Sequence, residues 1–264
     1  MTARSADGPW LKEYPNRIRR VEVLRRDAVT PRMLRLTFGG PGLAGFESHS
    51  PDEHVKILFP DPDGEPDGEL RLPEQDGDKL VWPRPLPVSR EYTVRRYDAG
   101  AGELDIDFVL HDGGLASSWA ATVQLGSSVW IAGPPRGLIV PDEYDYYVFA
   151  GDETALPAIA RSAGELPRTA IGRIGILVHD ATEEQPIEAP EGIQLSWLHR
   201  TGDPVSLLEG FLDSTVPPSG ARTYLWVAGE QRLLKPARSW AQQHGVRRHD
   251  RHTTGYWRAG RAGD

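Results

Sequence analysis

The stretch Arg90-Glu91-Tyr92-Thr93, followed by Val94-Arg95, sets the interpretation of the whole chain. Alternate residues of a strand share a face, so Arg90 and Tyr92 point the same way and Thr93 points to the other side. The guanidinium can then meet a pyrophosphate, while the phenol ring lies along a ribitol chain or a flat isoalloxazine ring. A stiff, extended lead-in is indicated by Pro83, Pro85 and Pro87. The segment therefore predicts a site for a flavin dinucleotide.

The composition of the chain limits what it can do. Its 264 residues suit one large domain or two of ordinary size, and 39% hydrophobic residues allow a packed core. Acidic residues outnumber basic ones by 38 to 30, and the net charge of −8 argues against a general nucleic-acid binder. The absence of cysteine excludes disulfides, thiolate catalysis and thiolate-held zinc or iron–sulfur centres within this polypeptide. One-electron chemistry therefore needs a bound organic cofactor or an external metal.

Neither the start of the chain nor its hydropathy indicates a membrane segment. Residues 1–16 lack the apolar core of a signal peptide, and no stretch approaches the roughly 20 apolar residues of a membrane helix. The eight histidines lack the spacing of a catalytic metal site beside a carboxylate. We therefore expect a cytoplasmic protein with no membrane association and no metal ligands of its own.

Short strands dominate the first half of the chain. In residues 103–110, for example, Leu104, Ile106 and Phe108 alternate with Asp105 and Asp107, which is typical of a half-buried strand. The strand candidates are residues 21–24, 33–38, 54–59, 90–93, 103–110 and 128–132. Six short strands at this spacing predict a small antiparallel β-barrel of six strands.

From residue 146 onward, strands alternate with helices. The predicted strands are 146–150, 174–179, 193–198 and 224–228, and the predicted helices are 156–166, 205–212 and 232–244. Continuous apolar strands separated by helices indicate an α/β domain with a parallel sheet covered on both faces. The boundary falls within residues 138–144, so we expect one domain at 17–140 and a second at 141–264.

Residues 111–120 join the end of a strand to a helix. Glycines followed by small residues place unpaired backbone N–H groups at a helix N-terminus, where a phosphate is stabilised. Ser117 can add a hydroxyl donor. The alternative is an ordinary glycine turn with a serine cap. His111 is at least as well explained by backbone contacts in the turn as by a contact with the flavin.

Two further strand ends run into helices. Residues 151–159 occupy the place of a dinucleotide-binding turn but lack the Gly-x-Gly-x-x-Gly spacing, and Asp152 and Glu153 would repel a pyrophosphate. The loop therefore suits neutral parts such as nicotinamide, ribose or the flavin edge, although Asp152 or Thr154 can also act simply as a helix cap. Ligands of open α/β sheets bind at the carboxyl ends of strands, which places Gly229 and Glu230 beside this loop.

Two features near the C-terminus have two explanations each. Tyr256 and Trp257 can stack on a planar ring or pin the tail to the core, and we favour the pinning role. The basic residues between positions 247 and 252 form either a solvated face or a docking surface for an anionic ligand, and the solvated face is favoured.

Together these motifs resemble those of the siderophore-interacting protein family, which are flavin-dependent ferric-siderophore reductases of the ferredoxin-reductase-like superfamily. The five motifs stand in family order at residues 90–95, 107–119, 151–157, 226–230 and 255–260. The resemblance implies an N-terminal FAD-binding barrel, a C-terminal NAD(P)H-binding-like domain, and FAD held without a covalent bond.

The resemblance also implies roles for single residues. Arg90 would meet the FAD pyrophosphate, Tyr92 would stack near the flavin, and Thr93 with Val94 would reach its polar edge. The remaining implied FAD contacts are Val109, His111, Gly114, Ala116 and Ser117. Further cofactor contacts are expected at Asp152, Thr154, Ala155, Gly229 and Glu230, and siderophore contacts at Lys56, Arg232 and Lys235. Leu115 stands where the family commonly has proline, which leaves the backbone donors in place.

The implied activity is release of iron by reduction of a ferric siderophore. NADH or NADPH would supply electrons through FAD, and no protein acid or base is required, so no catalytic residue is assigned. An external reduced ferredoxin is an alternative donor. A protein that only carries a siderophore or a flavin is the alternative of another class. We expect a monomer without nucleic-acid partners.

Overall fold

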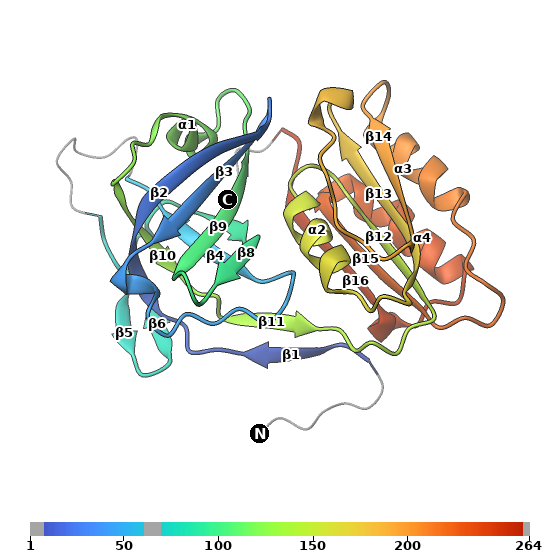
Figure 1. The fold of residues 1–264 in the computed structure, drawn as a ribbon, viewed down its shortest axis with the longest axis horizontal. Coiled ribbons are helices and arrows are strands. Elements are labelled where there is room, and N and C mark those ends of the chain that lie inside the picture. Colours follow the sequence, from blue (N-terminus) through green and yellow to red (C-terminus); the bar gives the residue numbers. More distant parts are fainter. Residues whose placement is uncertain (1–7, 61–69, 261–264) are drawn as a thin grey trace. The chain divides into compact units, whose positions relative to one another are not determined.

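The computed structural model of the chain describes residues 8–60 and 70–260 (Figure 1). These residues divide into two compact units. Leu11–Leu138 forms the first, and the second begins at Ile139 and includes residues 8–10. Each unit has its own hydrophobic core.

The first unit is built on one antiparallel sheet of seven strands in the order β7-β4-β10-β2-β3-β9-β8. The strands are β2 (Ile18–Thr30), β3 (Met33–Gly39), β4 (His54–Leu58), β7 (Ser89–Thr93), β8 (Arg96–Asp98), β9 (Glu103–Val109) and β10 (Ser128–Ala132). The six predicted strands are all present, and the short β8 was not predicted. Only Val94 and Arg95 separate the two edge strands β7 and β8 along the chain. The hydrogen-bonded order does not itself show a closed barrel, so closure stays a prediction.

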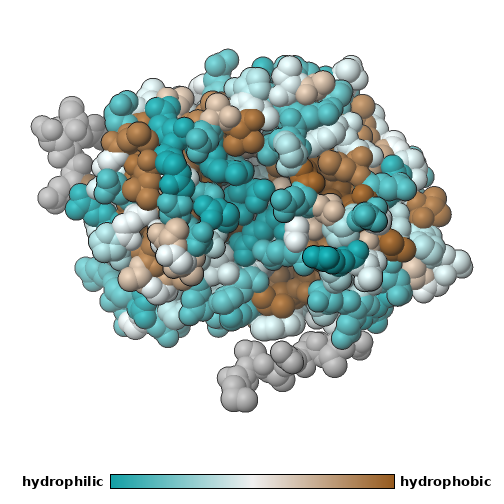
Figure 2. All heavy atoms as spheres, viewed as in Figure 1, coloured by the Kyte–Doolittle hydropathy of each residue, from teal (hydrophilic) through white to brown (hydrophobic). Residues whose placement is uncertain are grey.

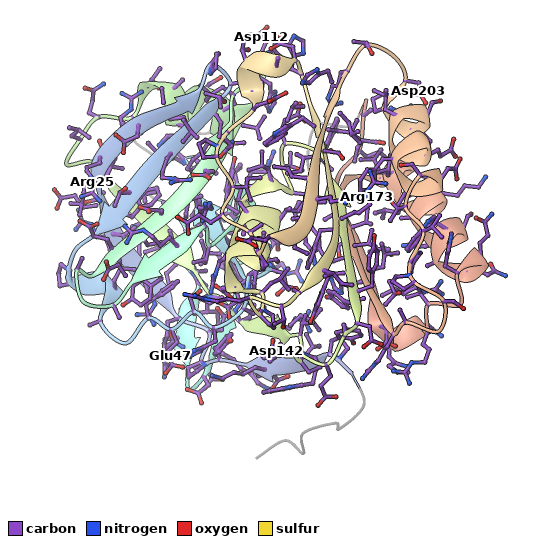
Figure 3. All side chains as sticks on the ribbon, turned by 45° about the vertical axis from the view of Figure 1, so that its right-hand side comes forward. Arg25, Glu47, Asp112, Asp142, Arg173 and Asp203 are labelled. Atoms are coloured by element: carbon purple, nitrogen blue, oxygen red, sulfur yellow. The ribbon has the colours of Figure 1, made fainter. Side chains whose placement is uncertain are left out.

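Alternation in β9 places its apolar side chains in the core. Leu104, Ile106 and Phe108 are fully buried, as the pattern predicts. Asp105 and Asp107 on the other face are only 4% exposed, because arginines from neighbouring strands cover them. Arg35 and Arg96 do this with hydrogen bonds of 2.6 Å (Nε to Asp107 Oδ1) and 2.7 Å (Nε to Asp105 Oδ2). The sheet therefore has an apolar face and an ion-paired face. Arg25 on the latter points outward from β2 (Figure 3).

Smaller elements complete the first unit. They are η1 (Pro41–Leu43), α1 (Leu115–Thr122) and the hairpin of β5 (Glu74–Asp76) and β6 (Lys79–Val81). A separate two-stranded sheet pairs β1 (Trp10–Glu13) with β11 (Arg136–Ile139), and the division between the units falls within both strands.

The second unit has a five-stranded sheet in the order β14-β13-β12-β15-β16, with every pair parallel. Its strands are β12 (Tyr146–Gly151), β13 (Ile171–Val178), β14 (Gly192–His199), β15 (Thr223–Glu230) and β16 (Arg251–Trp257). Its helices are α2 (Leu156–Glu165), α3 (Pro204–Asp213) and α4 (Leu234–Gln243), with short turns η2 (Ala181–Glu183), η3 (Gln231–Leu233) and η4 (Arg248–Asp250). The predicted α/β pattern is confirmed, and β16 is an additional edge strand.

Helices cover both faces of this sheet (Figure 1). Tyr147 and Phe149 of β12 pack with α2, whereas Val148 and Ala150 between them pack with α3 and α4. Two-sided burial explains why β12 is continuously apolar. Helix α3 begins at the N-cap residue Asp203, whose Oδ2 accepts the Ser206 N–H at 3.1 Å (Figure 3).

Hydrophilic residues cover most of the surface seen in Figure 2, and apolar residues form small separate groups on it. Across residues 8–60 and 70–260, none of the helices has the length and apolar character needed to cross a membrane.

Candidate functional site

The motif that predicts a flavin lies on β7, at one edge of the seven-stranded sheet. The Tyr92 ring packs on Phe108 with its centroid 4.3 Å away, which fixes the ring from the core side. Burial raises the pKa of the Tyr92 phenol, against the opposing charge of Arg90, so the phenol is neutral at physiological pH. Arg90 is partly buried and donates one hydrogen bond, from Nη1 to the Ser89 carbonyl at 2.8 Å. A fixed neutral ring and a partly shielded cation thus share one strand.

The end of β7 is anchored by Glu53. Val94 is fully buried, and its N–H donates to the Glu53 carbonyl at 2.8 Å. The buried Glu53 carboxylate accepts the Tyr14 hydroxyl at 2.5 Å and the His49 N–H at 2.9 Å. The position of Val94 is therefore determined by a hydrogen-bond network.

A second predicted feature is the turn between β9 and α1. Ser117 is buried, and its hydroxyl accepts the His111 N–H and donates to the His111 carbonyl, both at 2.8 Å. The predicted donation of this hydroxyl to phosphate is therefore not what the structure shows, since its proton is used within the turn. The exposed His111 ring lies over Gly114, where a Cβ would be 2.3 Å from the ring. Gly114 thus allows the turn to fold tightly.

The N-terminus of α1 fits an anionic phosphate. Its N-cap residue is Gly114, so no side chain caps the first turn. The N–H groups of a first helical turn have no partner inside the helix, and these belong to Leu115, Ala116 and Ser117. Gly113, with φ of +75°, gives the chain the left-handed step into the helix. This donor set suits the pyrophosphate of a dinucleotide.

In the second unit, the Asp152 carboxylate joins three elements. Asp152 is fully buried, and its Oδ1 accepts the Thr154 N–H at 3.0 Å and the Thr154 hydroxyl at 2.6 Å. Its Oδ2 accepts the Glu230 N–H and the Trp257 indole N–H, both at 2.8 Å. A Cβ on Gly229, which has φ of +128°, would lie 2.6 Å from the same carboxyl group. Asp152 therefore fixes the carboxyl ends of β12, β15 and β16 together.

The other two acids at this edge also have partners within the unit. Glu230 is 4% exposed, and its carboxylate accepts the Arg232 N–H at 2.8 Å and the Ala259 N–H at 3.3 Å. Glu153 forms a two-point pair with Arg200, with Nε to Oε1 at 3.1 Å. Burial lowers the pKa of Arg200, but the hydrogen bond and the charge of Glu153 raise it by more. The net effect is a raised pKa, so Arg200 is charged. All three carboxylates at this edge therefore have hydrogen-bond partners, and two of them are paired with arginines.

The structure brings together most of the predicted residues of the second unit. Thr154, Gly229 and Glu230 meet at Asp152, and Ala155 is the fully buried N-cap residue of α2 in place of the predicted Asp152 or Thr154. The sequence predicts Trp257 in the C-terminal tail but gives no sign of its hydrogen bond to Asp152, because the two residues are 105 positions apart in the chain.

Comparison with known proteins identifies the family. Residues 22–138 match the siderophore-interacting FAD-binding domain, and residues 144–260 match the siderophore-interacting protein domain. The chain belongs to the siderophore-interacting protein family. Ferric vibriobactin reductase ViuB of Vibrio cholerae is 34% identical over 254 residues, which cover 94% of this chain and 91% of that protein. The NADPH-dependent ferric-chelate reductase of Escherichia coli is 32% identical over 232 residues, covering 84% and 88%.

A solved structure of a siderophore utilization protein from T. fusca has the same fold. The two share 41% identity with a TM-score of 0.88, over 97% of this chain and 98% of the other. The resemblance inferred from the motifs is thereby confirmed.

In this siderophore-interacting protein, the basic residues expected to meet substrate differ in their surroundings. Lys56 lies opposite Glu91 in the β4–β7 register, and its Nζ is 2.6 Å from Glu91 Oε1. Burial would raise the pKa of Glu91, but Lys56, His54 and Arg136 together lower it, so Lys56 faces a carboxylate. Arg232 is exposed and donates from Nε to Glu230 at 3.1 Å, while Lys235 is exposed on α4.

The basic cluster near the C-terminus is partly structural. Arg247 donates from Nε to the Asp250 Oδ2 at 2.6 Å, and Arg222 donates to Oδ1 at 3.1 Å. Asp250 is 1% exposed and also accepts the Tyr144 hydroxyl at 2.8 Å. Arg247 therefore neutralises a buried carboxylate, and its charge is not available as part of a simple solvated face.

This cluster makes stability depend on pH. Burial opposes ionisation of Asp250, but the hydrogen bonds from Arg247, Tyr144 and Arg222 lower its pKa below the ordinary value. Because the folded-state pKa is depressed, its stabilisation is complete above the unfolded pKa of about 3.9 and is lost as pH falls below that value. We expect Asp250→Asn to lower the free energy of unfolding by roughly 1–3 kcal/mol at pH 7, measured by urea denaturation. The difference in unfolding free energy between wild type and Asp250→Asn should shrink as the pH falls from 5 to 3, since this range includes the unfolded-state pKa of Asp250.

The exposed Asp142 provides the control, and Asp142→Asn should leave the unfolding free energy almost unchanged at both pH values. A wild-type to Asp250→Asn difference that stays constant from pH 5 to pH 3 would show that Asp250 is not held ionised by its partners.

Proposed function

We propose that the chain is an FAD-dependent ferric-siderophore reductase that takes its electrons from NADH or NADPH. The observation that carries this proposal is the presence, in one unit, of the Arg90-x-Tyr92-Thr93 strand and of a helix that begins at Gly114 without a side-chain cap. The family match over both units supports the reaction, because two of the relatives are ferric reductases by name.

The FAD contacts proposed for this chain follow from the described donors. Arg90 and the backbone N–H groups of Gly114, Ala116 and Ser117 would hold the pyrophosphate. Tyr92 would pack against the flavin from the core side. Thr93 and Val94 would contact the polar edge of the flavin, and Val109 and His111 would contribute strand-end backbone groups.

The second unit would bind the nicotinamide nucleotide at the carboxyl ends of its strands, through Asp152, Thr154, Ala155, Gly229 and Glu230. Since the carboxylates of Asp152 and Glu230 are already hydrogen-bonded, these residues would shape the site through their backbone. Lys56, Arg232 and Lys235 are the proposed contacts for an anionic ferric chelate.

Bound FAD would supply the chemistry that lets a two-electron donor reduce iron one electron at a time. Fe(III) in a siderophore is held by hard oxygen donors, and reduction to Fe(II) lowers the charge and weakens those bonds. No acid or base of the protein is needed for this, so its residues would bind, orient and shield.

Closure of the seven-stranded sheet into a barrel is part of the proposal. A flat sheet of seven strands separates its edges by about 29 Å, from six spacings of about 4.8 Å. The Val94–Arg95 connection lets Thr93 and Arg96 lie at most about 11 Å apart. With β7 and β8 as one bent strand, the barrel has the six strands that the sequence predicts. Domain limits of 17–140 and 141–264, a monomer and a cytoplasmic location complete the proposal.

The function is tested by purifying the protein and recording its visible absorbance spectrum. We expect a yellow protein whose flavin absorbance bleaches on anaerobic addition of NADH or NADPH and returns when a ferric siderophore is added. A colourless protein that takes up no FAD would contradict the reductase function. If bound FAD bleaches only with reduced ferredoxin, then ferredoxin replaces NADH or NADPH as the proposed electron donor.

The assignment of Arg90 to the pyrophosphate predicts different behaviour for two basic residues. Arg90→Ala should reduce the FAD content of the purified protein severalfold, because a charge-assisted contact is lost. Lys56→Ala should retain FAD and instead raise KM for the ferric siderophore. Flavin released by heat and measured by absorbance gives the content of both variants. Equal FAD content in the two variants would count against the assignment.

A further inference from the structure

An exposed indole ring lies at the carboxyl edge of the parallel sheet. Trp257 is the last residue of β16 and is 38% exposed. Its N–H donates to Asp152 Oδ2 at 2.8 Å, so the ring is tied to the end of β12. Within residues 8–60 and 70–260, the Trp257 ring packs against no other aromatic ring. The ring is therefore fixed at its polar edge and exposed over part of its surface.

The chain at this point is shaped to hold the ring in place. Gly229 pairs with Gly255 and Glu230 pairs with Trp257, so Tyr256 is an extra residue in β16. Such a bulge changes the direction of the side chains that follow it. The Tyr256 ring packs against the Trp226 ring, with 6.5 Å between the ring centroids, whereas the Trp257 indole donates a hydrogen bond to Asp152. Ala259 N–H then donates to Glu230, which holds the chain beyond the indole.

This edge is where an α/β sheet binds nucleotides. In the order β14-β13-β12-β15-β16, the direction in which strands are added reverses between β12 and β15. Ligands of open α/β sheets bind at the carboxyl ends of the strands beside such a reversal. Asp152 bridges these two strands, because it also accepts the N–H of Glu230. The exposed indole thus stands at the expected nucleotide position.

The charges at this edge favour an uncharged ring over a phosphate. Asp152, Glu153 and Glu230 lie here. Arg200 pairs with Glu153 and Arg232 pairs with Glu230, whereas Asp152 accepts hydrogen bonds from N–H and O–H groups. These five side chains together carry one net negative charge, and both arginines are already paired, so they offer a pyrophosphate no free cation. A dihydronicotinamide ring is neutral, and its oxidised form is a cation that an indole face attracts.

We propose that Trp257 is the stacking surface for the nicotinamide ring of the electron-donating nucleotide, and that Asp152 is the positioning residue that holds the indole. The inference rests on the proposed function, since it assumes a nicotinamide nucleotide as donor. It extends that function by assigning the nicotinamide, and not the adenine, to the indole at the carboxyl ends of β12 and β16.

The test measures binding to the FAD-loaded protein by isothermal titration calorimetry. The probes are the oxidised nucleotide that binds wild type more tightly, NAD+ or NADP+, and its adenine-end fragment, 5′-ADP or 2′,5′-ADP. Trp257→Ala should raise Kd for the whole nucleotide at least about fivefold, the lower limit for loss of base–aromatic stacking. The same variant should bind the adenine-end fragment as wild type does. Trp257→Phe, which keeps an aromatic ring, should restore most of the affinity.

Tyr256→Ala is the matched control, because Tyr256 is the neighbouring residue and has the same 38% exposure. It should leave both affinities within about twofold of wild type, and the thermal midpoint of each variant reports its folding. Asp152→Asn tests the positioning role. It should weaken whole-nucleotide binding and raise KM more than it lowers kcat, while fragment binding is retained.

Several outcomes overturn the inference. One is an unchanged Kd for the whole nucleotide in Trp257→Ala, and another is equal weakening of the nucleotide and its adenine-end fragment. A loss in Tyr256→Ala that matches the loss in Trp257→Ala also contradicts it, as does a wild-type protein that binds neither nucleotide. The proposed function is judged separately, because dithionite-reduced protein should still reduce a ferric siderophore in every one of these cases.

Discussion

The two-residue connection between β7 and β8 is the constraint on which the first unit depends. Val94 and Arg95 join strands at opposite ends of the sheet order, so the sheet has to curl if both strands are to keep their partners. Hydrogen bonds fix the connection on both sides, from Val94 N–H to Glu53 and from Arg95 N–H to Asp105. The strand that carries Arg90 and Tyr92 thus ends at the bend. Its side chains are positioned by the closure that we propose for the sheet as well as by local packing.

In the second unit, acidic residues occupy the position that a glycine-rich turn has in many nucleotide-binding sheets. The Asp152 carboxylate accepts hydrogen bonds from N–H and O–H groups at three strand ends. The carboxylates of Glu153 and Glu230 have partners of their own. The acids therefore organise the loop and do not act as free anions. In the nucleotide site that we propose at this edge, these paired acids suit a neutral ring better than a pyrophosphate.

Much of the fold can be predicted from local patterns. The apolar runs of β12 and β15 reflect burial on both faces, and the alternation in β9 reflects a core on one side, so both kinds of strand are visible in the sequence. Edge strand β16 was missed because its Arg, His and Thr residues are only partly buried and give no apolar pattern. Contacts across the chain are equally hidden. The sequence does not show that Arg35 covers Asp107, that Arg247 neutralises Asp250, or that Ser117 bonds within its own turn.

We propose above all that this chain, with FAD bound, uses a two-electron donor to reduce siderophore iron one electron at a time. The most direct test is an anaerobic measurement of Fe(II) released per nicotinamide nucleotide oxidised, using a chromogenic Fe(II) chelator and excess ferric siderophore. We expect two Fe(II) per nucleotide with FAD-loaded protein, and no release above background with FAD-free protein. Nucleotide oxidation without Fe(II), or equal Fe(II) release from the FAD-free protein, would contradict the proposal.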